Sequence, residues 1–460
     1  MSKLGVTALA VFLGTAAAQA QTFSLKEALA TAYETNPQLD AQRAALRATD
    51  EGVAQANANW RPTINFQGSY GYQDTLIGGA RSLPPSFGVS SAATNHPLLG
   101  QVVISQPLFR GGRTWAEIGR AKSQVRAGAA QLTDVEEGVL LDAVTAYMDV
   151  VRDAATVRLR QNNVAVLQKQ LDATQEQFKV GELTRTDVAQ SQARLAGAQA
   201  DLTAAVGQLQ ISRSNFEHFV GRPAELLQEH PAFPPLPLSE SAAIDGSLEL
   251  NPTVVAAKEN ERASDYAVDD AAGALLPQLS IQGQYQYAHN PAQTELGVGN
   301  NEHITAVTGQ LTIPIYQGGG EEASVRQAKQ LDAQAKLNIA DAQRQVVDAT
   351  RTAWESYASA VAAIQSNKAQ VDANTVALDG VHQEQQVGSR TILDVLNAEQ
   401  ELLNSQVAVV SSERNAEVAA YQVLSATGKL TARDLGLPVK LYDPKEYYDD
   451  NAGRWFGLGD

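Results

Sequence analysis

The 460-residue sequence has no cysteine, only 6% aromatic residues and few basic residues. Without cysteine the chain can form no disulfide, no thiolate metal site and no lipid anchor on an N-terminal cysteine. After the first twenty residues it also lacks a run of about 18 apolar residues, which excludes a membrane-spanning helix in the mature chain. The formal net charge of −16 argues against binding to nucleic acid, because contact with a phosphate backbone needs clustered Lys and Arg.

Residues 1–20 have the pattern of a signal peptide for export. Lys3 supplies the positive end, Leu4 to Leu13 the short apolar core, and Ala18-Gln19-Ala20 a small-x-small cleavage site. The sequence turns polar directly afterwards, which disfavours the alternative of a buried N-terminal helix. We therefore predict that the mature protein leaves the cytoplasm.

The rest of the chain is an internal duplication. Several residues recur 207 positions later, namely Gly181 and Gly388, Tyr147 and Trp354, Pro107 and Pro314, and Gly221 and Gly428. Nearer the N-terminus the offset is 215, as between Pro62 and Pro277. Repeats of this kind predict repeated structural units. We predict a first structural repeat over residues 21–230, a second over 231–435, and an irregular C-terminal tail over 436–460 at the equatorial region.

Each repeat contains a long helical pattern that stops at a Val-Gly pair. The long helices are predicted at about 114–178 and 321–386, and in both copies a Thr-x-x-Asp sequence follows. Gly181 and Gly388 supply the left-handed residue that ends a helix, and Thr-x-x-Asp resembles a capping box for the next one. We therefore predict two helical hairpins, packed as coiled coils, with tips near 181–187 and 388–394.

Each repeat also contains two stretches in which apolar and polar residues alternate. They predict β-strands at about 62–72 and 101–109, and at about 277–288 and 304–315, joined by loops at about 73–100 and 289–302. In the third strand Leu279, Ile281 and Tyr285 alternate with glutamine and serine. An apolar face with aromatic ends opposite an amide-rich face is typical of strands in an outer-membrane β-barrel.

Four strands are too few for one chain to close a membrane barrel. An open sheet would leave unpaired backbone groups in lipid, at a cost of several kcal/mol for each group. Several copies must therefore contribute strands to one ring, and the same holds for helical hairpins about 100 Å long. The predicted fold class is a mixed α and β membrane protein that forms a cyclic oligomer.

Two stretches carry a specific resemblance to a known family. Pro314 to Gly319 reads Pro-Ile-Tyr-Gln-Gly-Gly, and Val387 to Leu396 reads Val-Gly-Ser-Arg-Thr-Ile-Leu-Asp-Val-Leu. With the duplication, they resemble the TolC family of outer-membrane efflux proteins. The resemblance implies a homotrimer with a 12-stranded outer-membrane β-barrel, four strands per chain, that continues into a 12-helix periplasmic α-barrel. It also implies a periplasmic adaptor protein and an inner-membrane ABC or RND transporter as partners, besides outer-membrane lipid.

The tail supports a narrower resemblance. Leu441 to Pro444 and the pair Trp455-Phe456 are similar to members that serve type I protein secretion. Secretion of a protein and efflux of small molecules both remain open as the activity of the duct.

By the same resemblance, Asp394 and Asn397 form a selectivity gate at the tunnel tip. The two residues are three apart on a helix and so share a face. Family members carry two aspartate rings there, and Asn397 replaces the second. A ring of Asp394 would favour cations. The alternative, compatible with this role, is that Asp394 only caps its helix.

The resemblance further implies a latch between neighbouring hairpin tips. Arg390 matches the family arginine, and Thr186 and Asp187 match its partners, so that a charge-assisted bond would hold the entrance shut. Gln385 stands where the family has a tyrosine, which suggests a weaker latch. The alternative is a solvated arginine, worth less than about 1 kcal/mol.

Motifs for catalysis or cofactor binding are missing from the sequence. The six histidines have no metal-ligand spacing, and Gly318 to Gly320 is not followed by the Gly-Lys-Ser/Thr of a phosphate loop. We therefore predict no enzyme activity, no metal and no cofactor. The leading hypothesis is a passive, gated export duct in the outer membrane. The alternatives are a periplasmic helical-hairpin adaptor without a pore and, with no residues in its favour, a periplasmic hydrolase.

Overall fold

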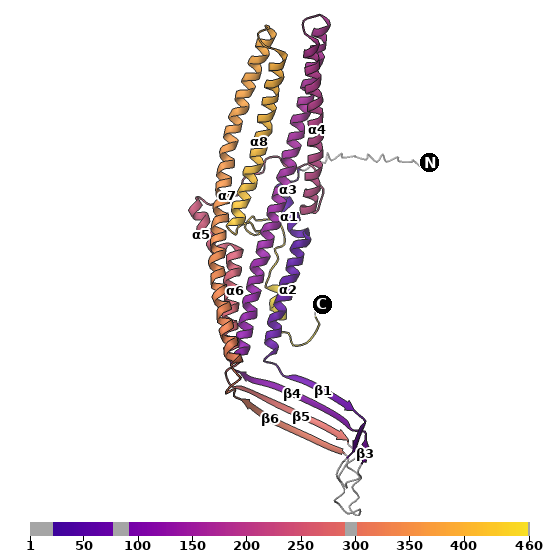
Figure 1. Ribbon diagram of the computed structural model, residues 1–460, viewed down its shortest axis with the longest axis vertical. Helices are drawn as coiled ribbons and strands as arrows, with labels where there is room; N and C mark the ends of the chain where they lie inside the picture. Colours follow the sequence, from indigo (N-terminus) through magenta and orange to yellow (C-terminus); the bar gives the residue numbers. More distant parts are fainter. Residues whose placement is uncertain (1–21, 77–91, 290–300, 459–460) are drawn as a thin grey trace, which may run out of the picture. The chain divides into compact units, whose positions relative to one another are not determined.

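The computed structural model describes residues 22–76, 92–289 and 301–458. The predicted signal peptide and the middle of both strand-connecting loops lie outside these residues. Figure 1 shows the course of the chain through its helices and strands. The chain divides into two compact units, each built from several stretches of sequence. The first unit contains residues up to Asp40, Val135–Asn251 and Val347–Leu441, and the second contains Ala41–Asp134, Pro252–Val346 and the chain from Tyr442 onward.

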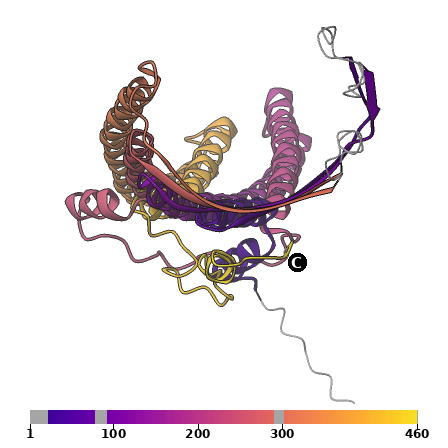
Figure 2. The same ribbon diagram turned by 90° about the horizontal axis from the view of Figure 1, so that it is seen from below.

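The second unit contains a four-stranded antiparallel sheet. Its strands, in spatial order, are β1 (Thr63–Tyr70), β4 (Leu98–Arg110), β5 (Gln278–His289) and β6 (Asn301–Thr312). All four follow one curved surface in Figure 2, as expected for twisted strands. Because β1 and β6 stand at the two ends of this order, the sheet has two open edges within the chain.

The register of the sheet aligns the apolar residues of all four strands. Ile64 lies opposite Ile104, which lies opposite Gly283, and Gly283 lies opposite Val307. Directly opposed residues in antiparallel strands point to the same face. The side chains of Ile64 and Val307 are 68% and 79% exposed. The single chain therefore leaves this apolar face uncovered.

The adjacent row of residues across the sheet is entirely polar. It consists of Thr63, Ser105, Gln282 and Thr308. Successive residues of a strand point to opposite faces, so this row lies on the face opposite to Val307. The sheet thus has one largely apolar and one largely polar face, and Leu99, Val103 and Ile304 are apolar residues on the polar face.

One predicted loop contains additional structure. The sequence places residues 73–100 in a loop, but its two ends pair as strands β2 (Gln73–Leu76) and β3 (Ala92–Asn95). Their sequences, Gln-Asp-Thr-Leu and Ala-Ala-Thr-Asn, show no clear alternation of apolar and polar residues, so the sequence pattern did not reveal them. Strand β4 also begins before residue 101, because its first residues pair with both β1 and β5.

The second unit also contains helices, and the C-terminal tail packs against two of them, α2 (Pro37–Ala58) and α3 (Arg113–Lys179). The helices of this unit comprise most of α2, the first part of α3, α6 (Pro252–Gly273), the first part of α7 (Gly320–Gln386) and α9 (Glu446–Asn451). The tail was predicted to be irregular, but α9 is helical. Val53 and Ala121 form an apolar cluster against which Tyr448 packs, and the Tyr447 hydroxyl donates to Glu51 over 2.8 Å. The tail is therefore docked on α2.

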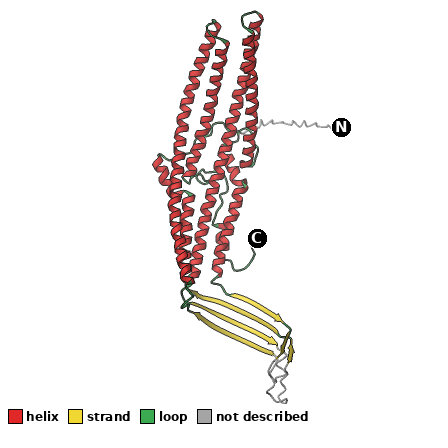
Figure 3. Cartoon of the chain, viewed as in Figure 1, coloured by secondary structure: helices red, strands yellow, loops and turns green. Residues whose placement is uncertain are grey.

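The long regular elements of the first unit are helices within the described residues, and irregular connectors join them (Figure 3). Its elements are α1 (Leu25–Thr35), α4 (Arg185–Val220), α5 (Glu240–Leu250), α8 (Ile392–Ala426) and the second parts of α3 and α7. Helices α3 and α7 have 67 residues each. Within the described residues, no helix combines the length and the apolarity needed to cross a membrane.

A cluster of aromatic side chains, the aromatic node, joins Phe23, which precedes α1, to helices α3 and α4. Phe216 and Tyr147 are fully buried, with ring centroids 6.2 Å apart, and Phe23 lies edge-on to Phe216. The Tyr147 hydroxyl donates to the Phe23 and Gln228 carbonyl oxygens over 2.8 and 3.0 Å. Burial raises the pKa of Tyr147 to about 12, so its hydroxyl stays a donor.

Candidate functional site

The two hairpin tips of the first unit have the same backbone geometry. The turn after α3 contains Gly181 at φ +84°, and the turn after α7 contains Gly388 at φ +79°, a conformation that glycine adopts without strain. The N–H of Gly181 donates to the Phe178 carbonyl, and the N–H of Gly388 to the Gln385 carbonyl. These bonds satisfy carbonyls left over at the helix ends. Both tips are therefore tight, well-defined turns.

A capping box starts the helix after each turn. Thr184 caps α4 and Thr391 caps α8; each hydroxyl accepts from the backbone N–H three residues later. In return the carboxylates of Asp187 and Asp394 accept from the N–H and the hydroxyl of these threonines at 2.7–2.9 Å. The sequence pattern Thr-x-x-Asp predicts both boxes, and the structure contains them.

Asp394 is ionised at neutral pH in this geometry. The backbone N–H and the hydroxyl of Thr391, together with the charge of Arg390, hold the pKa of Asp394 below its ordinary value. Its side chain therefore caps the helix and carries a full negative charge at the tip. The structure is compatible with both roles that the sequence leaves open.

Asn397 lies on the same face of α8 but is engaged by another hairpin. Its side-chain oxygen accepts a hydrogen bond of 2.7 Å from Arg194 on α4. Next to this contact, α4 and α8 contribute to an apolar cluster that includes Leu195, Ile392 and Leu396. The sequence analysis missed Arg194, which adds a positive charge beside the predicted gate.

Arg390 makes an ion pair within its own hairpin. Its Nε donates to Glu384 over 2.7 Å, and both side chains are about half exposed. The structure does not bring Arg390 onto Thr186 or Asp187: Asp187 is engaged in its capping box, and Thr186 is exposed. Within the described part of a single chain, Arg390 and Asp187 are thus engaged with other partners, and the latch stays a prediction.

The sequence analysis also missed a buried carboxyl group near the second tip. Glu399 on α8 is only 7% exposed, and burial raises the pKa of its carboxyl to about 7. The ring nitrogen Nε2 of His382 lies 3.8 Å from one carboxylate oxygen. The sequence carries no sign that this glutamate is buried. The helical spacing shows which residues lie on the same face of α8, but not whether that face is covered.

Comparisons with known proteins point to one family. The family model described as outer membrane efflux protein matches residues 28–222 and 243–429 of the chain. The outer membrane efflux protein BepC of Brucella suis is 36% identical over 437 residues, which cover 95% of this chain and 92% of that protein. The outer membrane protein TolC of Vibrio cholerae is 25% identical over 440 residues, with 95% and 97% covered.

A solved structure shows a similar fold. The outer membrane protein VceC of Vibrio cholerae superposes with a TM-score of 0.74, at 20% sequence identity. The match covers 88% of this chain and 96% of that chain. The likeness therefore extends over most of the chain.

Proposed function

Because the chain belongs to the outer membrane efflux protein family, we propose that it is the outer-membrane exit duct of a tripartite export system. Three copies would each contribute a four-stranded sheet to one barrel of twelve strands. The long hairpins would continue this barrel as a twelve-helix tunnel in the periplasm. The proposed activity is the passage of cargo through the enclosed channel, without any chemical change of the cargo.

The observation that carries this proposal is the uncovered apolar face of a sheet with two open edges. Val307 and Phe66 are 79% and 75% exposed on it. Unpaired edge groups in lipid cost several kcal/mol each, whereas sheets from neighbouring copies would pair the edges of β1 and β6. The same face disfavours the alternative of a periplasmic adaptor without a pore, because such a protein has no lipid to cover it.

The duct itself supplies no energy, so its partners must. We propose that an inner-membrane ABC or RND transporter and a periplasmic adaptor protein dock at the hairpin tips. Deleting the gene should leave the cargo inside the cell, either a secreted protein or a toxic small molecule. Purified protein should form pores in planar lipid bilayers. Failure to form pores in bilayers would contradict the proposed duct.

We propose that Arg390 and Asp187 of neighbouring tips form the latch that restricts the tunnel entrance. Arg390→Ser and Asp187→Ala should each raise the single-channel conductance in planar bilayers. The physical reason is the loss of one charge-assisted bond between hairpins. Unchanged conductance in both variants would remove the latch from the mechanism.

Two control variants separate the latch from local effects. Thr184→Ala removes the capping box that contains Asp187 but keeps the aspartate charge, so conductance should stay near that of the unmodified protein. Glu384→Ala removes the ion pair of Arg390 within its own hairpin. That exposed pair is worth less than about 1 kcal/mol, and its loss leaves Arg390 available to the neighbouring tip. Conductance should therefore not rise.

A ring of Asp394 side chains should make the duct prefer cations. Asp394→Asn is expected to lower the cation-to-anion permeability ratio several-fold, measured from reversal potentials across a salt gradient. Thr391→Ala is the matched control, because it breaks the same capping box and keeps the charge. An equal loss of cation preference in both variants would mean that Asp394 acts only as a helix cap.

A further inference from the structure

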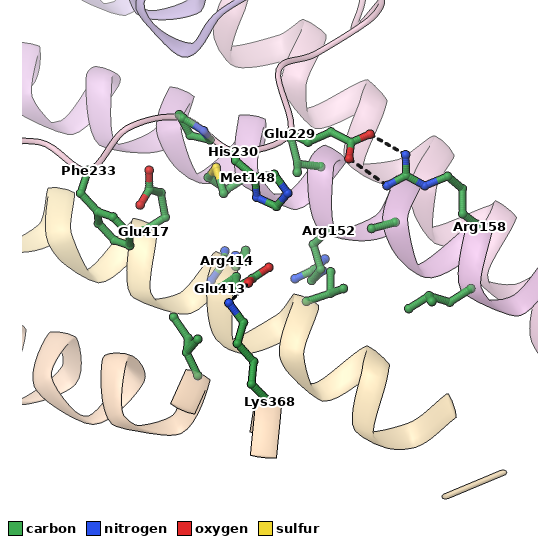
Figure 4. A pocket seen from close by; sticks show the side chains of 16 residues that line it. Met148, Arg152, Arg158, Glu229, His230, Phe233, Lys368, Glu413, Arg414 and Glu417 are labelled. Atoms are coloured by element: carbon green, nitrogen blue, oxygen red, sulfur yellow. Dashed lines mark hydrogen bonds and ion pairs between the residues drawn. The ribbon is translucent and has the colours of Figure 1, made fainter. Parts of the chain in front are cut away.

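A cavity of about 520 Å³ lies within the first unit, between α3, α7 and α8 and the connector that follows α4 (Figure 4). Its apolar lining comes from four elements and includes Met148, Leu159, Phe233, Ile364 and Val410. The volume falls in the range of pockets that hold small organic ligands. The cavity is remote in sequence from the hairpin tips, and the proposed export mechanism does not use it.

The cationic side chains around the cavity all have carboxylate partners. The pairs are Lys368 with Glu413 at 2.9 Å, Arg414 with Asp149 at 2.8 Å, Arg152 with Asp153 at 2.7 Å, and Arg158 with Glu229. Their charges are therefore largely compensated within the protein. An anionic ligand would have to displace one of these carboxylates.

Glu417 differs from the other carboxylates that line the cavity. Its side chain is only 3% exposed, and within the described residues its Oε1 has no hydrogen-bond partner. Figure 4 shows it projecting from α8 toward the connector that carries Phe233. A buried polar atom without a hydrogen-bond partner destabilises the folded protein, and the penalty is larger when the group is charged. A donor placed in the cavity would remove this cost.

We propose that the cavity binds a small organic amine, whose ammonium group pairs with Glu417 and whose apolar body packs against Met148 and Phe233. A neutral apolar ligand would leave the carboxylate unsatisfied. A cation supplies both the charge and the N–H donors that the buried carboxylate lacks. The ring of Phe233, half exposed in the cavity, adds a cation–π contact.

The test is binding of 9-aminoacridine, a planar aromatic cation, to the detergent-solubilised full-length protein. Titrations are run at mildly alkaline pH, because burial raises the pKa of Glu417 to about 7 and the carboxylate must be ionised. The unmodified protein should bind one probe per chain with saturation. Glu417→Gln should weaken binding at least about tenfold, the equivalent of 1.4 kcal/mol. Phe233→Ala should weaken it as well.

Two controls address charge and micelle binding. Glu401→Gln makes the same charge change at an exposed position of α8 outside the cavity, and it should bind the probe like the unmodified protein. Acridine, which is uncharged at this pH, should bind Glu417→Gln and the unmodified protein equally weakly. The amide of Glu417→Gln has nearly the size of the carboxyl and avoids a buried charge, so this variant should fold and assemble.

The outcomes decide the proposal in either direction. Saturable binding that depends on Glu417, but not on Glu401, supports an amine site. The proposal is overturned if the unmodified protein shows no saturable binding, if Glu417→Gln binds 9-aminoacridine equally well, or if acridine binds as tightly as the cation. None of these results bears on pore formation, so the duct is tested separately.

Discussion

Val307→Arg should abolish assembly of the protein in the outer membrane. Val307 lies on the apolar face of β6 in a row with Ile64, Ile104 and Gly283, and its side chain is 79% exposed in the single chain. An arginine on the lipid face of a barrel costs about 2–4 kcal/mol near the bilayer midplane. A trimer would carry this cost three times, which is comparable to the whole stability of a typical domain.

The neighbouring residue provides the matched control. Thr308 lies in the polar row with Thr63 and Gln282, on the opposite face of the same strand. Thr308→Arg would face the water-filled lumen and should assemble normally. The measurement is the amount of heat-modifiable oligomer in the outer-membrane fraction. Normal assembly of Val307→Arg, or equal failure of both variants, would mean that lipid does not cover this face.

The contrast between the neighbours Val307 and Thr308 also explains why the sheet could be predicted from the sequence. Alternation has a period of two, and a strand displays it over a few neighbouring residues, as Leu279, Ile281 and Tyr285 do. The tips were predictable for a similar reason: a left-handed glycine and a capping box each need only four or five consecutive residues. The twofold repetition of both patterns strengthened weak local signals.

The contacts between separate elements could not be predicted in this way. Arg194 and Asn397 are 203 residues apart in the chain, and no local pattern relates them. Glu384 lies close to Arg390 in sequence, but their ion pair depends on the path of the turn at Gly388. The strands β2 and β3 were missed because they have only four residues each and show no clear alternation of apolar and polar residues. Family resemblance supplied candidate roles for the tip residues, whereas their partners came from the structure.

Phe216→Ala should release the N-terminal helix α1 from the first unit. Phe216 is fully buried, and its ring packs against Phe23 and Tyr147. Replacing a buried phenylalanine with alanine typically costs 3–5 kcal/mol, because the side chain is lost and a cavity remains. The residues around Phe23 also pair with the connector, since the Phe23 N–H donates to the Leu226 carbonyl over 2.7 Å. The lost packing should therefore destabilise both α1 and the connector that follows α4.

Amide hydrogen exchange measures the destabilisation of α1 directly. Protection of the α1 amides should fall about a hundredfold or more in Phe216→Ala, since each 1.4 kcal/mol corresponds to a factor of ten. The matched control is Phe178→Ala, which removes a phenylalanine ring that is 44% exposed near the end of α3. It should leave α1 protection unchanged. Pore formation should survive in Phe216→Ala if α1 braces the helices from outside the conducting path. Loss of the pore would instead mean that the aromatic node sets the spacing of α3 and α4 along the tunnel wall.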